Sequence, residues 1–86
     1  MKNVGYEIIM ESQFHESAMY TESVVLGMRD DESYVTWIMI TWHEEDNHKT
    51  SFEHGHYTST LRSALDDYYE RVLHYMELEK KINSFA

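Results

Sequence analysis

The chain has 86 residues, a net charge of −9 at pH 7 and no cysteine. A single domain of this length buries only about 60–65% of the surface that its unfolded chain exposes, and the lack of cysteine excludes disulfide and thiolate chemistry. The apolar runs fall far short of the roughly 20 residues that span a bilayer, and an acidic surface repels nucleic acid. We therefore expect a soluble, cytoplasmic protein that binds neither membranes nor nucleic acid directly.

The amino-terminal segment, residues 1–14, is compatible with two secondary structures. Behind a possible cap at Asn3, four apolar residues recur at helical spacing: Tyr6, Ile9, Met10 and Phe14. An alternating, strand-like set is also present: Val4, Tyr6, Ile8 and Met10. We favour the helix, and we expect residues 15–21 to form an irregular connection after it.

Three segments predict antiparallel strands: residues 22–29, 34–42 and 50–57. The second, YVTWIMITW, is rich in β-branched and aromatic residues and is apolar on both faces. Such a strand is central in its sheet and covered twice, or it is covered once and uses the other face for contact. Short polar turns at residues 30–33 and 44–49 join the three strands into a meander.

From Thr58 onward the apolar residues follow the three-and-four spacing of a helix that we expect to reach about Lys81. A second apolar stripe on this helix consists of Tyr69, Leu73 and Met76. This stripe has to pack against either the amino-terminal helix or a second copy of the chain. The predicted fold is a single α+β domain, residues 1–86. It combines a three-stranded antiparallel meander with a long C-terminal helix and an N-terminal helix.

Short motifs in residues 22–72 resemble a group of small, largely uncharacterised proteins of Gram-positive bacteria, their phages and mobile elements. The motifs are VLG at 25–27, YVTW at 34–37, GHY at 55–57 and D-x-x-x-R at 67–71. The chain departs from the group at His54, where the group has Trp, at Thr58, where it has Phe, and in its longer helix. The resemblance implies a mobile-element setting and carries no known activity.

Six histidines raise the question of a metal site. His43, His54 and His56 on neighbouring strands could share Zn²⁺ with Glu44 or Glu45. Without cysteine, however, a structural site would need three or four ligands from these turns alone, and His56 fits better as a partly buried, hydrogen-bonding residue of the sheet. We therefore predict no metal and no cofactor.

Catalytic motifs are equally weak in this sequence. No nucleophile elbow, glycine-rich phosphate loop or paired-carboxylate motif surrounds its serines, histidines and aspartates. The helix carries three nearby acids, Asp66, Asp67 and Glu70, which fit ordinary charge pairing on a helix surface. The sequence therefore predicts a protein that is not an enzyme.

The two acidic turns carry the leading hypothesis. They flank the middle strand, and about eleven residues at roughly 3.3 Å each separate them by about 35 Å, so their carboxylates could imitate a phosphate backbone. This favours a phage or mobile-element protein that inhibits a host protein with a basic surface, such as a defence nuclease of the CRISPR-effector type. The alternative is a homodimeric structural or regulatory module. Trp37 is added as a contact residue, because it lies on the apolar face that we expect to be exposed. The predicted contact residues are Asp30, Asp31, Glu32, Trp37, Glu44, Glu45 and Asp46.

Overall fold

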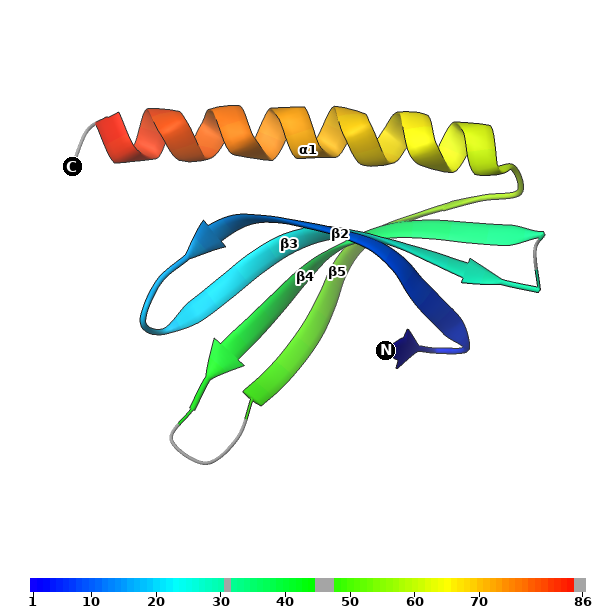
Figure 1. Ribbon diagram of the computed structural model, residues 1–86, viewed down its shortest axis with the longest axis horizontal. Helices are drawn as coiled ribbons and strands as arrows, with labels where there is room; N and C mark the ends of the chain where they lie inside the picture. The colour runs from blue at the N-terminus through cyan, green and yellow to red at the C-terminus, as the bar shows by residue number, and fades with distance from the viewer. Residues whose placement is uncertain (31, 45–47, 85–86) are drawn as a thin grey trace.

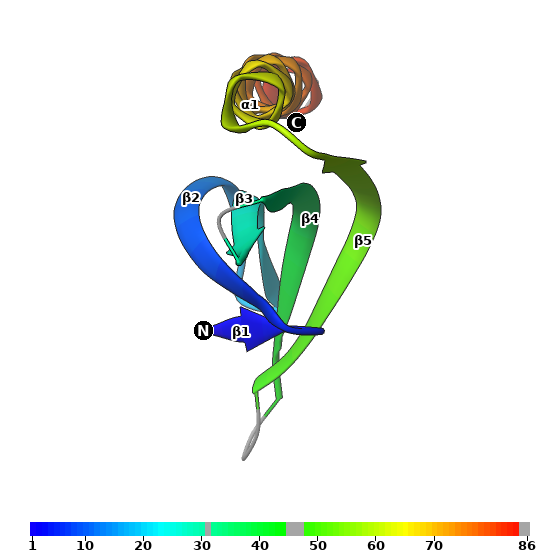
Figure 2. The same cartoon turned by 90° about the vertical axis from the view of Figure 1, so that its right-hand side faces the viewer.

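The computed structural model describes residues 1–30, 32–44 and 48–84. These residues form one antiparallel sheet whose strands are ordered as in the chain, followed by one long helix. The sheet curls into a half-barrel, and the helix runs across one of its faces (Figures 1 and 2). The elements are β1 (Lys2–Asn3), β2 (Tyr6–Glu16), β3 (Tyr20–Arg29), β4 (Ser33–His43), β5 (His48–Thr58) and α1 (Leu61–Ser84).

The expected amino-terminal helix is wrong, and so is the three-stranded meander, because residues 6–16 form strand β2. This strand pairs with β3 from Glu7 opposite Met28 to Glu16 opposite Thr21. A bulge between Ile8 and Met10 turns the strand, so that residues before it face one core and residues after it face the other. Ile9, which completed the helical spacing, lies at this bulge and is 42% exposed.

The three expected strands are present within β3, β4 and β5, and the carboxy-terminal helix is present as α1. β3 begins at Tyr20, inside the segment expected to be irregular. Helix α1 begins at Leu61 instead of at Thr58, because Thr60 is its cap: the Thr60 hydroxyl accepts a hydrogen bond from the backbone N–H of Ser63 at 3.2 Å.

Strand β4 supplies both hydrophobic cores of the molecule. On the helix side, Tyr34 and Ile38 pack with residues of β3 and α1: Val24, Leu26, Ala64 and Tyr68. On the other side, Val35, Trp37 and Met39 pack with Tyr6 and Val25. Strand β4 is therefore covered twice, once by the helix and once by the curl of its own sheet.

The curl of the sheet closes around Trp37, which is only 3% exposed. The Tyr6 ring from β2 lies edge-on to the indole at 5.6 Å, and Phe52 from β5 lies at 5.2 Å. Tyr6 also reaches Tyr57 of β5, with ring centroids 6.0 Å apart. Strands from both sides of the sheet thus meet over one side chain.

A bulge in β5 accommodates the indole. Thr36 pairs with His56 and Ile38 with Glu53, so Trp37 faces two residues of β5, His54 and Gly55. His54 has a φ of 53°, in the left-handed region that non-glycine residues seldom adopt. A Cβ atom on Gly55 would lie 2.8 Å from the indole nitrogen of Trp37 and 2.9 Å from the Tyr57 ring. The position therefore has no room for a side chain.

We expect Gly55→Ala to lower the free energy of unfolding by about 1–3 kcal/mol, because the Trp37 and Tyr57 rings must move to admit a methyl group. Urea denaturation followed by tryptophan fluorescence measures this. The control is Glu53→Ala on the same strand, an exposed position where we expect a change within about 0.5 kcal/mol. Equal stability of Gly55→Ala and wild type would show that the rings do not close over this backbone.

Candidate functional site

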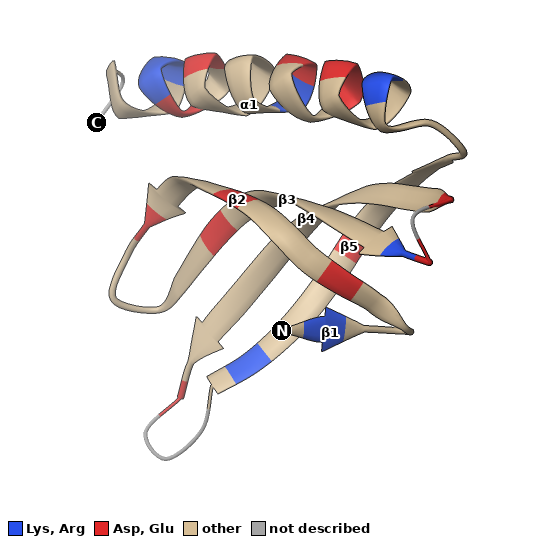
Figure 3. Cartoon of the chain, turned by 45° about the vertical axis from the view of Figure 1, so that its right-hand side comes forward, with Lys and Arg blue, Asp and Glu red and all other residues tan. Residues whose placement is uncertain are grey.

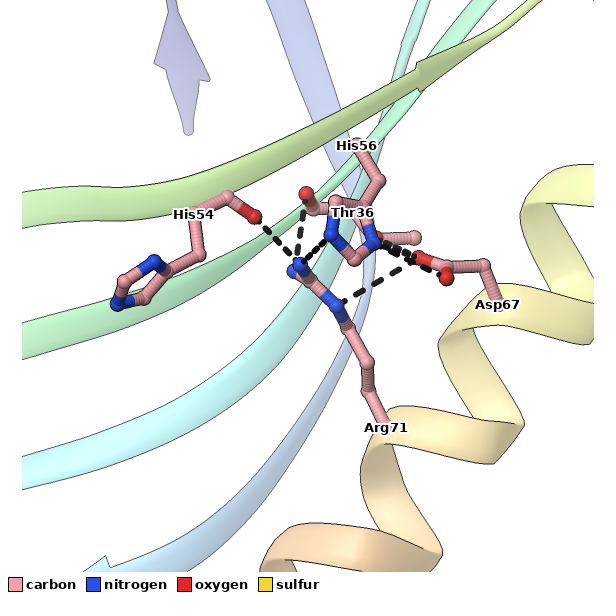
Figure 4. A network of polar contacts seen from close by, with 5 residues as sticks. All are labelled: Thr36, His54, His56, Asp67 and Arg71. Atoms are coloured by element: carbon pink, nitrogen blue, oxygen red, sulfur yellow. Dashed lines mark hydrogen bonds and ion pairs between the residues drawn. The ribbon is translucent and has the colours of Figure 1, made fainter.

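A cluster of polar side chains joins the middle of α1 to β4 and β5 (Figure 4). Its centre is the guanidinium group of Arg71, whose side chain is only 9% exposed. One terminal nitrogen donates to the backbone oxygen of His54 at 2.6 Å and contacts Nε2 of His56 at 2.6 Å. The other donates to the backbone oxygen of Thr36 at 3.3 Å. The bulge in β5 thus presents a carbonyl group to a buried cation.

Asp67 lies one turn before Arg71 and completes the cluster. Its carboxylate accepts hydrogen bonds from the Thr36 hydroxyl and from Nδ1 of His56, the latter at 3.0 Å, and lies 3.6 Å from Nε of Arg71. A guanidinium group only donates, so Nε2 of His56 has to accept from Arg71. The ring proton of His56 therefore lies on Nδ1 and is donated to Asp67. The hydrogen bonds among Thr36, His56, Asp67 and Arg71 therefore hold all four side chains in place.

The surroundings shift the pKa values of the two charged members. Burial raises the pKa of Asp67, but the hydrogen bonds from Thr36 and His56 together with the charge of Arg71 outweigh burial, so its pKa lies below the ordinary 3.8. Burial lowers the pKa of Arg71, while the Asp67 carboxylate opposes that change. Because the pKa of an arginine lies far above neutral pH, the ion pair stays charged there.

An open cavity of about 340 Å³ lies beside the cluster, between β5 and α1. Its lining combines charged, aromatic and imidazole groups: His54, His56, Asp67, Glu70, Arg71, His74 and Tyr75. The hydrogen-bond order differs from that of a nucleophilic triad, in which the hydroxyl bonds to histidine; here the Thr36 hydroxyl donates to the carboxylate. Thr36 is also fully buried. The hydrogen bonds of Asp67 and Arg71 to β4 and β5 hold the helix on the sheet.

Sequence reasoning treated these residues separately and missed the cluster. Asp67 was grouped with the helix-surface acids, whereas it is partly buried and bonded to three side chains. The one available signal was the set of motifs: Thr36 lies in YVTW, His56 in GHY, and Asp67 and Arg71 in D-x-x-x-R. The structure brings all four residues together. His56 is a hydrogen-bonding residue of the sheet, as expected, but its side chain is 57% exposed instead of partly buried.

The described acids of the two turns lie at the surface. Asp30 and Glu32 are exposed, and their carboxylates make no ion pair within the described residues. Glu44 is exposed and lies 3.9 Å from Nζ of Lys49. Three further predicted contact residues fall outside the described part of the chain: Asp31, Glu45 and Asp46.

Trp37 lies in the core instead of on an exposed aromatic face, and at 3% exposure it has no free surface to offer a partner. The three histidines considered for a zinc site, His43, His54 and His56, are also not grouped as a metal site. His43 lies beside His48 near the β4–β5 turn, while His56 contacts Asp67 and Arg71. Among the described residues no three histidines, aspartates or glutamates are grouped to hold a metal ion.

Comparisons with protein-family models, with curated proteins and with solved structures found no match to the chain. Within the described residues, no helix is long and apolar enough to cross a membrane. The surface and the polar cluster are therefore the basis for inferring function.

We expect Asp67→Asn to lower the free energy of unfolding by about 2 kcal/mol, because the buried guanidinium of Arg71 loses its only anionic partner in the cluster. Asp66→Asn is the matched control, since it removes the same charge from an exposed neighbour and should change stability by about 0.5 kcal/mol or less. Thermal or urea denaturation at neutral pH gives both values.

The same pair of variants tests the pH dependence. A carboxylate with a lowered folded-state pKa stabilises the protein fully above its unfolded-state value of about 3.8, and this stabilisation disappears as the pH falls through the folded-state pKa. The gap between wild type and Asp67→Asn should therefore be constant near neutral pH and narrow below about 3.8. A gap that stays unchanged in acid would contradict the ionic role of Asp67.

Proposed function

We propose that this chain is a small phage or mobile-element protein that binds a host protein with a basic surface and inhibits it in the host cytoplasm. The partner's surface is one that otherwise binds nucleic acid, as in a defence nuclease. The observation that carries the proposal is the set of exposed carboxylates at both ends of β4, which the chain's own cations leave largely unneutralised.

The turn between β3 and β4 illustrates this best. Asp30 and Glu32 are exposed and make no ion pair within the described residues. The neighbouring cation, Arg29, places its guanidinium carbon 4.6 Å from the centre of the Tyr6 ring and makes no ion pair among the described residues. This cation–π contact leaves the charge of the turn available to a partner.

The second acidic position lies at the opposite end of β4, where Glu44 follows the strand. Figure 3 shows acidic positions at both turns, with the length of the strand between them. Eleven residues at roughly 3.3 Å each separate the turns by about 35 Å. Carboxylates with this spread can follow a basic groove and steer association electrostatically. Binding of this kind weakens as salt rises.

We expect the triple variant Asp30→Lys, Glu32→Lys and Glu44→Lys to lose capture of its partner while keeping the fold. The control variant carries Glu53→Lys, Asp66→Lys and Glu77→Lys, which change the net charge equally at exposed positions elsewhere. Pull-down from a Gram-positive host lysate, read by mass spectrometry, should give a nucleic-acid-binding protein with wild type and with the control. Duplex DNA should compete for it.

Salt provides the second measurement on the same complex. Raising the salt from about 0.1 M to about 1 M shortens the screening length from about 10 Å to about 3 Å, so capture by wild type should fall steeply. Capture that is independent of salt, or that persists in the triple turn variant, would refute the acidic docking surface. Circular dichroism verifies that both variants are folded.

A homodimeric module is the second candidate, and one observation favours it. Tyr69, Leu73 and Met76 are 54%, 66% and 39% exposed on α1, and no amino-terminal helix is present to cover them. The hydroxyl of the adjacent Tyr68 lies 2.5 Å from Ser12 of β2, so this part of the helix lies near the sheet edge. Beyond Glu7, β2 pairs on one side only within the described chain. An unpaired edge and an apolar stripe are features of self-association.

The dimer reading predicts a solution mass of twice the 10.3 kDa of one chain at micromolar concentration, measured by light scattering. Leu73→Glu should return the mass to one chain, because it places a charge in the apolar stripe. Leu78→Glu is the control, since Leu78 is 42% exposed but outside that stripe. A monomeric wild-type protein would remove this candidate.

A further inference from the structure

Two exposed histidines face each other at the end of the β4–β5 hairpin. His43 and His48 are direct cross-strand partners, and their Nδ1 atoms lie 3.2 Å apart. The ring centroids are 5.3 Å apart and the ring planes cross at 82°. Since only one proton can lie between two imidazole nitrogens at this distance, one ring donates and the other accepts.

The separation of the two nitrogens matches the bite of a metal ion. Imidazole nitrogen binds Zn²⁺ at about 2.0–2.1 Å, and two such bonds at a tetrahedral angle place the nitrogens about 3.3 Å apart. At the right angle of a square-planar Cu²⁺ site they lie about 2.9 Å apart. The observed 3.2 Å falls between these values. We propose that His43 and His48 form a binding site for a divalent transition metal that prefers imidazole, Cu²⁺ or Zn²⁺.

Strand pairing preorganises the site. Register is continuous from Thr41 opposite Thr50 to His43 opposite His48, so the backbone fixes the spacing of the two side chains before a metal arrives. Both side chains are exposed, and the rings can turn their nitrogens toward one ion without disturbing a core. A metal ion then takes the place of the shared proton, which passes through water to Nε2 of the ring that carried it, and the Nδ1 atom of each ring forms one coordinate bond.

The two histidines leave coordination positions open to water, since within the described residues no third histidine, aspartate or glutamate is grouped with them. An open site of this kind follows the general order of metal affinity, so Cu²⁺ binds more tightly than Zn²⁺. The adjacent Glu44 is 3.9 Å from Lys49 in a weak surface ion pair, which leaves its carboxylate free to turn toward the ion.

Other histidines of the chain lack this arrangement. Both ring nitrogens of His56 are engaged, by Asp67 and Arg71, and Nδ1 of His15 contacts Glu79 at 2.7 Å. His54 and His74 are exposed and line the cavity beside α1, but no contact pairs their rings. They therefore provide internal controls of the same residue type. The site is independent of the proposed partner and is tested on the isolated protein.

Titration of the full chain, made without a histidine tag, with Cu²⁺ and with Zn²⁺ tests the site. Calorimetry should give one ion per chain and tighter binding of Cu²⁺. Imidazole ¹⁵N NMR with Zn²⁺ should shift the ring signals of His43 and His48 and leave those of His54 and His74 unchanged. For Cu²⁺, electron paramagnetic resonance should show two coordinated nitrogens.

His43→Gln and His48→Gln should each weaken binding at least about tenfold, since loss of an outer-shell partner alone can cost that factor. The double variant His54→Gln and His74→Gln should bind as wild type does. Any of three results would overturn the site: no binding to wild type, unchanged binding in His43→Gln and His48→Gln, or metal-induced shifts at His54 and His74 instead. The NMR assignment decides the matter on wild type alone if a variant folds poorly.

Discussion

The guanidinium group of Arg71 ties the helix to the sheet, and the architecture depends on the bulge in β5 that receives it. At this bulge His54 adopts a left-handed conformation, and its carbonyl oxygen accepts a 2.6 Å hydrogen bond from Arg71. Gly55, the next residue, has no side chain, and the Trp37 indole fills the space on the opposite face. One backbone irregularity therefore serves both cores. A buried cation is costly unless it is paired and fully hydrogen-bonded, which Asp67 and the carbonyl groups of β4 and β5 provide.

A chain of 86 residues forms two cores here because its sheet curls. A single flat sheet under one helix would leave the face carrying Val35, Trp37 and Met39 in water. The curl brings Tyr6 of β2 to Tyr57 of β5 and closes that face over the indole. Strand β2 thus contributes to the cores on both sides of the sheet, and the register shift between Ile8 and Met10 lets this one strand do so.

The sequence predicted the elements that carry a clear local signal. Strand β4 was found from its β-branched and aromatic residues, and α1 was found from one apolar stripe that runs from Ala64 to Tyr75. Strand β2 was missed because its bulges disturb the alternation and imitate helical spacing. That error had a consequence: with the amino-terminal segment assigned to a helix, the face of Trp37 lacked its cover and was expected to be exposed. The polar cluster was beyond local reasoning, because it joins residues 36, 54–56 and 67–71 through pairing that no local pattern encodes.

The acidity of the surface follows from where the cations lie as well as from their number. The chain has three arginines, and the fold engages two of them in contacts other than ion pairs with the turn acids: Arg71 in the polar cluster and Arg29 on the Tyr6 ring. The cation–π contact of Arg29 is made within the turn region that carries Asp30 and Glu32, so a nearby positive charge is held by an aromatic ring instead of a carboxylate. Because folding engages both cations in other contacts, the exposed carboxylates of Asp30 and Glu32 make no ion pair within the described residues.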